Sequence, residues 1–377
     1  MNKVADRKTI LFVHHGVGIG GASINLRSVV KSFEGKGYDL IVLFLQDSDA
    51  KKLFLDIDCQ IIISRFPIYY FYHMSKWVKY WQIHKLCIQG VSFLFHLLFV
   101  SRFYIKRLKP DIVYLNSSVL TDWCLSCYFL GVKNILNVQE TISKGYFGLR
   151  KKLIKNIITK CSNRVLFISD FNRLCLVNSG FKNYDIIYNT LESSAGDIQK
   201  KPFTEKLYDF VYLGGDSYIK GWDYVNALLE SNMTFTMCFA GSVSNEENIK
   251  LLVSDPRIIY MGVVDDATHL ISNAKFLLSP FKEAHFSRPI MEAYYCDTVP
   301  IATDLPGVDE QLINDVTGAL FLNDTESFLK MIRYAKNINE AKYNDLINAA
   351  ELFRLRFSIQ SNQNAIIDSI QSVIKKR

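Results

Sequence analysis

The sequence lacks the paired cysteines and histidine clusters from which structural metal sites are built. Its eight cysteines are scattered along the chain, and only Cys124 and Cys127 lie close together. That pair falls in an apolar stretch with no second pair to complete a site, which disfavours zinc binding and redox chemistry. Buried free thiols of this kind are common in reducing compartments.

Signals for export and for a membrane span are also scarce. The N-terminal stretch Met1–Lys8 is polar and runs straight into a predicted strand, so we expect no signal peptide and a cytoplasmic protein. The apolar run Val91–Val100 is shorter than the ~20 residues that a transmembrane helix needs. Hydrophobic residues make up 49% of the 377 positions and charged residues 21%, which is typical of a folded protein with two domains.

Charge of one sign is only mildly in excess, with 44 Lys+Arg against 37 Asp+Glu and a net charge of +7. This balance is compatible with anionic substrates or an anionic membrane surface, and by itself it does not indicate nucleic-acid binding. The region Phe66–Lys109 is dense in aromatic and basic residues. Such a composition is typical of an interfacial membrane contact, and equally of a core helix with exposed basic flanks. Both interpretations stay open at this point.

Short apolar runs alternate with longer amphipathic stretches in both halves of the chain. This alternation predicts parallel strands covered by helices on both faces, and hence two doubly wound α/β domains that bind ligands at the carboxyl ends of the strands. We expect domains over 1–195 and 196–355, joined by a polar segment near 189–202. The predicted strands are Thr9–His14, Asp39–Leu45, Asp111–Asn116, Asn134–Gln139 and Arg164–Ser169, then Asp209–Gly214, Thr234–Gly241, Arg257–Met261, Lys275–Ser279 and Thr298–Thr303.

A glycine-rich loop follows the first predicted strand. Gly16, Gly18 and Gly21 match G-x-G-x-x-G, a pattern that lets the backbone approach a phosphate at a helix N-terminus. A dinucleotide-dependent dehydrogenase would also need an acidic residue at the end of the second strand. Asp39 stands at the start of that strand and Asp47 lies too far beyond it, which disfavours this class. The loop indicates an anion site or a tight turn.

The second half contains a denser set of candidate residues. A predicted strand ends in Gly214 and Gly215, and Lys220 follows at a strand-to-helix junction, where a cation can pair with phosphate. Further on, Pro289 suits the first turn of a helix, and we expect Glu292 in that opening turn. There its carboxylate can cap the helix or accept hydrogen bonds from a diol such as a ribose.

The segment Phe286–Ala293, followed by Asp297–Asp304 and Gly307–Glu310, resembles glycosyltransferase family four, the group 1 glycosyl transferases. The resemblance extends along most of the chain and is most specific from Lys220 to Thr303. It implies a GT-B fold, with two Rossmann-like domains facing each other across a cleft, and a retaining enzyme that uses nucleotide sugars. It also implies that the final helix, over 356–377, packs back on the N-terminal domain.

The resemblance also implies a role for each matched residue. Lys220 would neutralise the donor diphosphate, Glu292 would bind the donor ribose, and Glu283 would reach the sugar; these three are the candidate catalytic residues. The other implied donor-binding positions are Gly20, Gly21, Gly214, Gly241, Arg288, Thr298 and Val299, and the implied acceptor-side positions are Gln139 and Glu140.

Two positions depart from the family pattern. The family places an arginine just after the first strand of the second domain, where this chain has Gly215. One residue more than usual separates Glu283 from Glu292, which puts Ala284 in the first glutamate's place. Arg288 is our candidate for the lost positive charge. Because of these departures, a catalytically weak binding or scaffold protein stays open as an alternative, as does a nucleotide-sugar epimerase.

From these features we expect a metal-independent glycosyltransferase of hexosyltransferase type, without a cofactor because the nucleotide sugar is a substrate. Its acceptor is expected to be a glycan or a lipid-linked glycan in the biosynthesis of surface polysaccharide or lipopolysaccharide. The expected partners are the donor, this acceptor and an anionic membrane at its inner face, with peripheral contact. No nucleic-acid partner is expected.

Overall fold

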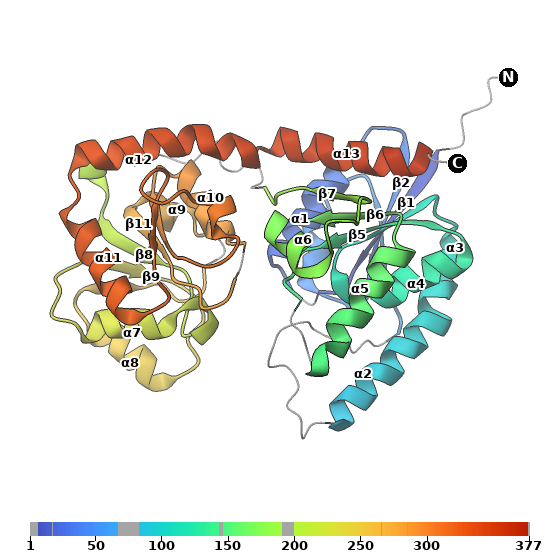
Figure 1. Ribbon diagram of the computed structural model, residues 1–377, viewed down its shortest axis with the longest axis horizontal. Helices are drawn as coiled ribbons and strands as arrows, with labels where there is room; N and C mark the ends of the chain where they lie inside the picture. The colour runs from blue at the N-terminus through green and yellow to red at the C-terminus, as the bar shows by residue number, and fades with distance from the viewer. Residues whose placement is uncertain are drawn as a thin grey trace. The chain divides into compact units, whose positions relative to one another are not determined.

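The computed structural model describes residues 7–16, 18–66, 83–142, 146–190, 200–264, 266–284 and 286–375. The chain forms two compact units: Met1–Asn189 with Gln360–Arg377, and Thr190–Ile359. Each unit is built around one parallel sheet with helices on its faces (Figure 1). The boundaries therefore lie at 189/190 and 359/360, where the sequence suggested 195/196 and 355/356.

The sheet of the first unit has seven strands in the order β3-β2-β1-β4-β5-β6-β7, all paired in parallel. The strand order reverses between β1 and β4, which creates a switch point where ligands bind in doubly wound folds. The strands are β1 (Lys8–His14), β2 (Tyr38–Phe44), β3 (Gln60–Ile63), β4 (Ile112–Leu115), β5 (Lys133–Val138), β6 (Arg164–Phe167) and β7 (Tyr184–Ile186).

The sheet of the second unit has six parallel strands in the order β10-β9-β8-β11-β12-β13. Its switch point lies between β8 and β11. The strands are β8 (Tyr208–Tyr212), β9 (Met237–Phe239), β10 (Ile258–Tyr260), β11 (Ala274–Ser279), β12 (Val299–Thr303) and β13 (Ala319–Phe321).

The apolar runs seen in the sequence are buried on both faces of these sheets. In β1, Leu11 and Val13 enter one core of the first unit, while Ile10 and Phe12 enter the core on the opposite face. This alternation is what a strand covered by helices on both sides requires. The helices are α1 (Gly21–Lys31), α2 (Ile83–Phe95), α3 (Ser101–Leu108), α4 (Thr121–Leu130), α5 (Leu149–Cys161), α6 (Asp170–Leu176), α7 (Trp222–Glu230), α8 (Glu246–Ser254), α9 (Thr268–Ser272), α10 (Arg288–Tyr295), α11 (Thr325–Asn337), α12 (Glu340–Phe353) and α13 (Ile359–Lys375).

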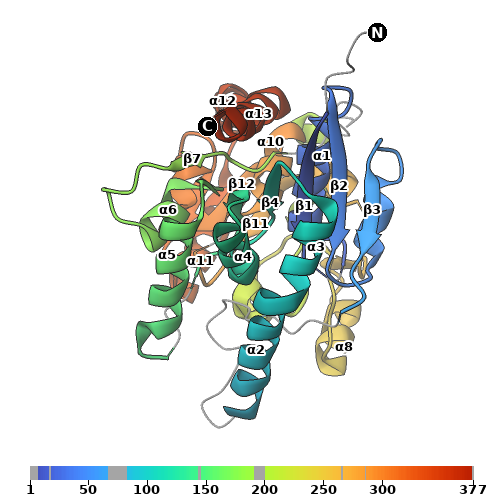
Figure 2. The same cartoon turned by 90° about the vertical axis from the view of Figure 1, so that its right-hand side faces the viewer.

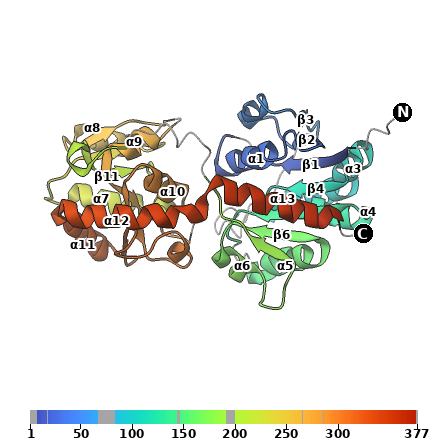
Figure 3. The same ribbon diagram turned by 90° about the horizontal axis from the view of Figure 1, so that it is seen from above.

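The last helix, α13, packs on the first unit (Figure 3). Its apolar stripe of Ile366, Ile370 and Val373 is buried in the same core as β1. Polar contacts secure both ends, since Asn362 Nδ2 donates to the Tyr188 carbonyl at 2.5 Å and Lys133 Nζ donates to the Ile374 carbonyl at 3.1 Å. Helix α13 therefore completes the core of the first unit.

Helices α2 and α3 form one continuous helix through a π-helical segment, His96–Val100. Within the described residues, Cys87–Leu108 is the one helix that is long and apolar enough to cross a membrane, judged by its 22 residues and its composition alone. The helix therefore extends past the apolar run Val91–Val100 at both ends, and its length no longer excludes a span. Residues 67–82 of the aromatic and basic region lie outside the described residues.

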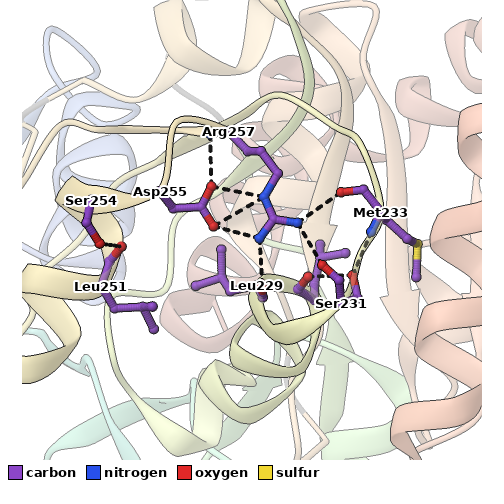
Figure 4. Close-up of polar contacts among 8 residues, drawn as sticks. Leu229, Ser231, Met233, Leu251, Ser254, Asp255 and Arg257 are labelled. Atoms are coloured by element: carbon purple, nitrogen blue, oxygen red, sulfur yellow. Dashed lines mark hydrogen bonds and ion pairs between the residues drawn. The ribbon is translucent and has the colours of Figure 1, made fainter.

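Arg257 holds together three segments of the second unit (Figure 4). Its guanidinium pairs with Asp255 at 2.6 Å and donates to the carbonyls of Ser231 and Met233, both at 2.9 Å, at the end of α7. It also lies 4.6 Å from the centre of the Phe235 ring. Because these partners occupy the guanidinium, Arg257 stabilises the fold and is a poor candidate for binding a ligand.

Candidate functional site

The carboxyl edge of the second sheet is shaped by glycines that pack against one another. Gly215 has φ +61°, and a Cβ there would lie 2.0 Å from the Ser242 carbonyl oxygen. Gly241 has φ +125°, and its Cβ would lie 2.4 Å from the Gly215 nitrogen; a Cβ on Gly214 would lie 1.9 Å from Tyr212 Oη. Only glycine fits these positions without a backbone shift. The arginine expected at 215 is therefore incompatible with this packing.

Lys220 ends a short 3-10 turn, Tyr218–Lys220, beside these glycines. Its carbonyl accepts a hydrogen bond from Tyr212 Oη at 3.1 Å, and the Ile219 carbonyl accepts one from the Lys282 backbone N–H at 2.9 Å. Gly221, with φ +86°, lets the chain approach Pro280 closely. The backbone of Lys220 is thus fixed, while its side chain is exposed and its ammonium group has no ion pair with a described residue.

A second lysine at this edge, Lys282, was not singled out in the sequence. Its ammonium group pairs with Asp223 at 2.6 Å and lies 3.2 Å from the centre of the Tyr224 ring. Burial opposes the charge, but the hydrogen bond to Asp223 raises the pKa of Lys282 above its ordinary value. Lys282 is therefore bound within the protein, and Lys220 is the lysine of this edge that is available to an anion.

Helix α10 begins at Arg288, with Pro289 in its first turn as predicted. Glu292 lies one turn further on, so the expectation that it occupies the opening turn and can cap the helix is wrong. Its carboxylate instead accepts a hydrogen bond from Arg288 Nε at 2.7 Å. Burial raises the pKa of Glu292, and the Arg288 charge opposes this rise. The side chains are 12% and 34% exposed, so Arg288 stays within reach of solvent.

Arg288 has an unusual position for a cation. It occupies the N-terminal end of α10, where the helix dipole is positive, and the first turn contains no acidic residue. The Ser287 side chain does not cap the helix; Ser287 Oγ lies 3.1 Å from Ser279 Oγ at the end of β11. An anion at this terminus would interact favourably with both the guanidinium and the free backbone N–H groups.

The remaining predicted donor residues differ in their placement. Glu283 is exposed in the segment between β11 and α10, next to Ala284. Thr298 and Val299 are fully buried at the amino end of β12, whereas the glycines and Lys220 lie at the carboxyl edge. Because ligands of parallel sheets bind at the carboxyl edge, this placement removes Thr298 and Val299 from the candidate site.

Thr298 serves the core instead. Its hydroxyl donates to the Ile271 carbonyl at 2.7 Å and accepts from Lys206 Nζ at 3.1 Å. Lys206 also donates to the carbonyls of Ser272 and Cys296, and burial lowers its pKa to about 8. No local sequence pattern indicates this buried lysine, because its partners come together only in the folded unit.

The carboxyl edge of the first sheet contains a network of hydrogen-bonded side chains. Gln139 Nε2 donates to Asn116 Oδ1 at 2.7 Å, and Asn116 Nδ2 donates to the Ala22 carbonyl at 3.0 Å. The same Nδ2 lies 3.1 Å from His14 Nδ1. Because the Ala22 carbonyl can only accept, the Asn116 atom that contacts it must be the donor, Nδ2. This Nδ2 also donates to His14 Nδ1, which must therefore be the unprotonated ring nitrogen. Burial lowers the pKa of His14 to about 4, so its ring is neutral.

Glu140, the second predicted acceptor-side residue, follows Gln139 at the end of β5. Its carboxylate accepts hydrogen bonds from Ser117 Oγ at 2.5 Å and from Ser118 Oγ at 2.9 Å. Burial raises the pKa of Glu140 and the hydroxyls oppose the rise. The structure thus brings Gln139 and Glu140, which follow β5, to the same edge of the sheet as His14, which ends β1, with Asn116 after β4 between them. The sequence pointed only to Gln139 and Glu140.

The glycine loop leads into α1 with Gly20 as its N-cap. Gly20 N–H donates to Ser23 Oγ at 2.9 Å, which ties the loop to the first helical turn. A Cβ on Gly20 or Gly21 would meet no atom within 4 Å. Unlike Gly215, these glycines are not required by packing within their own unit, which is consistent with a role in contact with a ligand.

Two Asp-x-Asp sequences occur in the first unit, at Asp47–Asp49 and Asp56–Asp58. Their carboxylates are used in surface ion pairs: Asp47 with Lys51, Asp49 with Lys52 and Asp56 with Arg27. No cluster of three metal-ligating side chains occurs among the described residues. These aspartates are therefore poor candidates for a metal site.

Residues 210–336, within the second unit, match the family model described as glycosyl transferases group 1. At the level of sequence, no curated protein matches the chain. Several solved structures share the fold at low identity. The Anabaena protein HepE, solved with UDP, is 15% identical with a TM-score of 0.76 over 97% of this chain and 100% of that one.

Two further structures agree with this comparison. A glycosyltransferase from Rickettsia africae is 18% identical, with a TM-score of 0.76 over 99% of this chain and 100% of its own. The lipopolysaccharide outer core galactosyltransferase WaaB is 15% identical, with a TM-score of 0.70 over 97% and 99%. The predicted GT-B fold, with two α/β domains on parallel sheets, is confirmed. Together with the family match, the fold supports a GT-B glycosyltransferase.

Proposed function

We propose that the protein is a retaining glycosyltransferase that moves a sugar from a nucleoside-diphosphate sugar to a glycan or lipid-linked glycan. One observation carries this proposal: the family match spans the segment that contains both Lys220 and Glu292. Within that segment Lys220 is a backbone-anchored, exposed cation at the carboxyl edge of the sheet. Such a cation suits a diphosphate leaving group.

The proposed mechanism follows from where charge develops. When the bond between the sugar and the diphosphate breaks, the leaving oxygen becomes more negative. Lys220 and the N-terminus of α10 supply positive potential for that oxygen, and we propose that no metal ion is needed. Gly214 and Gly241 allow the close backbone packing that sets the position of this edge. Glu283, exposed and close to α10 in sequence, is our candidate for a contact to the donor sugar.

We propose that Arg288 replaces the arginine that Gly215 cannot provide. In the unliganded chain it pairs with Glu292. Donor binding would break this ion pair. The guanidinium would turn to a donor phosphate, and the carboxylate would accept hydrogen bonds from the ribose hydroxyls. An exposed i,i+4 pair is worth only about 0.3–0.5 kcal/mol, and Arg288 is the more exposed partner at 34%, so its guanidinium is the group that can turn away.

The acceptor is proposed to bind the first unit near Gln139 and Glu140, with Gly20 and Gly21 approaching the donor phosphates. Support comes from the polar network at this edge and from the open space beside the two glycines. The acceptor class, a surface polysaccharide or lipopolysaccharide precursor, is proposed by likeness to WaaB, whose own acceptor lies in the lipopolysaccharide outer core.

A thermal-shift screen against UDP, GDP, ADP, CMP and their sugar conjugates tests this function. A ligand that binds only the native state raises the midpoint of unfolding, so one nucleotide should stand out. Turnover of the matching sugar conjugate should then be measured. If the folded protein shifts with none of these nucleotides, the glycosyltransferase proposal fails and a binding or scaffold role gains support.

A further inference from the structure

The helix Cys87–Leu108 is apolar on two faces, and only one of them is covered. Val100, Tyr104 and Ile105 are at most 5% exposed and pack in the core of the first unit. The opposite face is open to solvent, at positions that recur with helical spacing. Its exposed large apolar residues are Ile88, Val91, Leu94, Phe95, Leu98, Phe99 and Phe103.

Two neighbouring helices extend this uncovered surface (Figure 2). On α4, Tyr128 and Phe129 are more than half exposed, and the Arg102 guanidinium of α3 lies 5.8 Å from the Phe129 ring centre. On the adjacent α5 segment, Phe147, Leu149 and Leu153 are also more than half exposed. We call the exposed apolar residues of these three segments the outer helical face.

The charges around the outer helical face are of one sign. About one residue in ten of the chain is acidic, yet 83–109 and 146–161 contain no aspartate or glutamate. The one carboxylate on α4, Asp122, is fully buried. Basic side chains at the surface of these segments include Lys85, Lys106, Arg107, Lys152 and Lys160. An apolar surface on segments whose exposed charges, among the described residues, are all basic complements an anionic bilayer.

The same packing argues against a membrane span. For Cys87–Leu108 to cross a bilayer, it would have to leave the first unit and uncover Val100, Tyr104 and Ile105. It would also separate Ser101 Oγ from Ser126 Oγ, which lie 2.6 Å apart in the buried contact between α3 and α4. Lying on the bilayer buries the outer helical face and keeps both contacts.

We propose that the outer helical face lies in the interfacial region of an anionic lipid bilayer, with its apolar side chains among the acyl chains and its lysines and arginines at lipid phosphates. The benefit for catalysis rests on the proposed function, since a lipid-linked acceptor is met at that surface. Binding to the bilayer itself does not depend on turnover.

Co-sedimentation with vesicles tests the proposal. The full-length protein should bind vesicles of phosphatidylcholine mixed with phosphatidylglycerol at low salt, and bind vesicles of phosphatidylcholine alone much more weakly. Added salt should reduce binding. Alkaline carbonate should release the bound protein, because a peripheral contact is not held by a span.

Matched variants assign the contact to this face. Phe99→Ser combined with Phe129→Ser should abolish sedimentation, whereas Val253→Ser combined with Leu322→Ser, at similarly exposed positions of the second unit, should leave it unchanged. Lys106→Glu and Lys152→Glu should each weaken binding at least about fivefold, as expected for one charge near an anionic surface. Lys36→Glu and Lys250→Glu are exposed charge controls.

Three outcomes would overturn the proposal: equal binding to both kinds of vesicle, resistance to alkaline carbonate, or unchanged binding by the Phe99 and Phe129 variant. Absence of vesicle binding together with self-association in solution would assign the face to a second copy of the chain instead. Nucleotide binding by the same variants is measured in parallel. Loss of membrane binding with nucleotide binding intact separates this inference from the proposed function.

Discussion

The carboxyl edges of the two sheets are built in different ways. In the first unit, Gln139, Asn116 and His14 bind one another and the first turn of α1. In the second unit, Lys220 is anchored through its backbone while its charge is left free, beside glycines that allow no side chain. At the first edge, the side chains bind one another and hold a defined shape. At the second edge, a lysine with no ion pair among the described residues can bind an anion electrostatically. This difference is why we assign the leaving group to the second unit.

The strongest test of this comparison is removal of the Lys220 ammonium group. Lys220→Ala should lower kcat/KM for the nucleotide sugar roughly 100–1,000-fold, the usual cost of losing one charge-stabilising group. Thermal unfolding should hardly change, because the ammonium group has no partner among the described residues. Lys250→Ala, another exposed lysine of the second unit, is the control. Similar rates for the two variants would refute the role of Lys220.

The second test concerns the glycine edge. Gly215→Ala should destabilise the protein by about 3 kcal/mol or more, because left-handed strain adds to a clash with the Ser242 backbone. Gly262→Ala is the matched control: it has φ +65° but no atom within 4 Å of its Cβ, so it should cost about 1 kcal/mol. Chemical denaturation measures both. An equal cost would show that the close packing is unimportant.

A third test concerns a buried ionisable group of the first unit, the carboxyl group of Asp122 on α4. Burial raises the pKa of Asp122 from 3.8 to about 7, and His96 Nδ1 lies 3.9 Å from its carboxylate. Because the folded state holds the proton more tightly, the stability from Asp122 is present below pH 3.8 and is lost as the pH rises through 7. Asp122→Asn should therefore become more stable than the wild type above pH 7, by up to about 4 kcal/mol, since each pH unit between 3.8 and 7 contributes about 1.4 kcal/mol.

The control for this test compares how the free energy of unfolding of the two proteins changes with pH. Denaturation curves of wild type and Asp122→Asn should converge as the pH falls toward 4. If the difference stays constant between pH 4 and 8, the ionisation of Asp122 does not limit stability.

The smallest expected effect comes from His14. Its pKa falls from 6.5 to about 4 on folding, so the stability it contributes is present above pH 6.5 and is lost as the pH falls through 4. His14→Gln should remove up to about 3 kcal/mol of the acid sensitivity in this range, at about 1.4 kcal/mol for each pH unit between 6.5 and 4. Its unfolding free energy should be followed between pH 7 and pH 4. An unchanged acid sensitivity would mean that His14 is not buried as a neutral ring.

The fold could be predicted from the sequence because most central strands are largely apolar runs. The strand Thr9–His14 is one such case, since sheets covered on both faces require such runs. Two edge strands were missed, β3 (Gln60–Ile63) and β13 (Ala319–Phe321), and in β3 none of the four residues is buried as the residues of a central strand are. Lys220 could be singled out because its glycine context is local in the sequence.

Other parts of the candidate site depend on contacts that no local pattern contains. Lys282 and Lys220 are both lysines near glycines or prolines, and only the fold shows that Asp223 occupies one of them. Thr298 was assigned to the donor by resemblance, although the predicted strand Thr298–Thr303 already placed it at the amino end. Glu292 was expected in the opening turn of α10, where it could cap the helix, and the helix start at Arg288 places it beyond that turn.

The position of α13 has a consequence for how the protein is made. Ile366, Ile370 and Val373 fill the core of the first unit, yet the ribosome adds them only after the whole second unit. The core residues of the first unit that α13 covers therefore stay uncovered until the whole second unit has been synthesised. Truncation before Ile366 removes this closing segment, so a shortened chain should aggregate during expression even though every residue of the second unit is present.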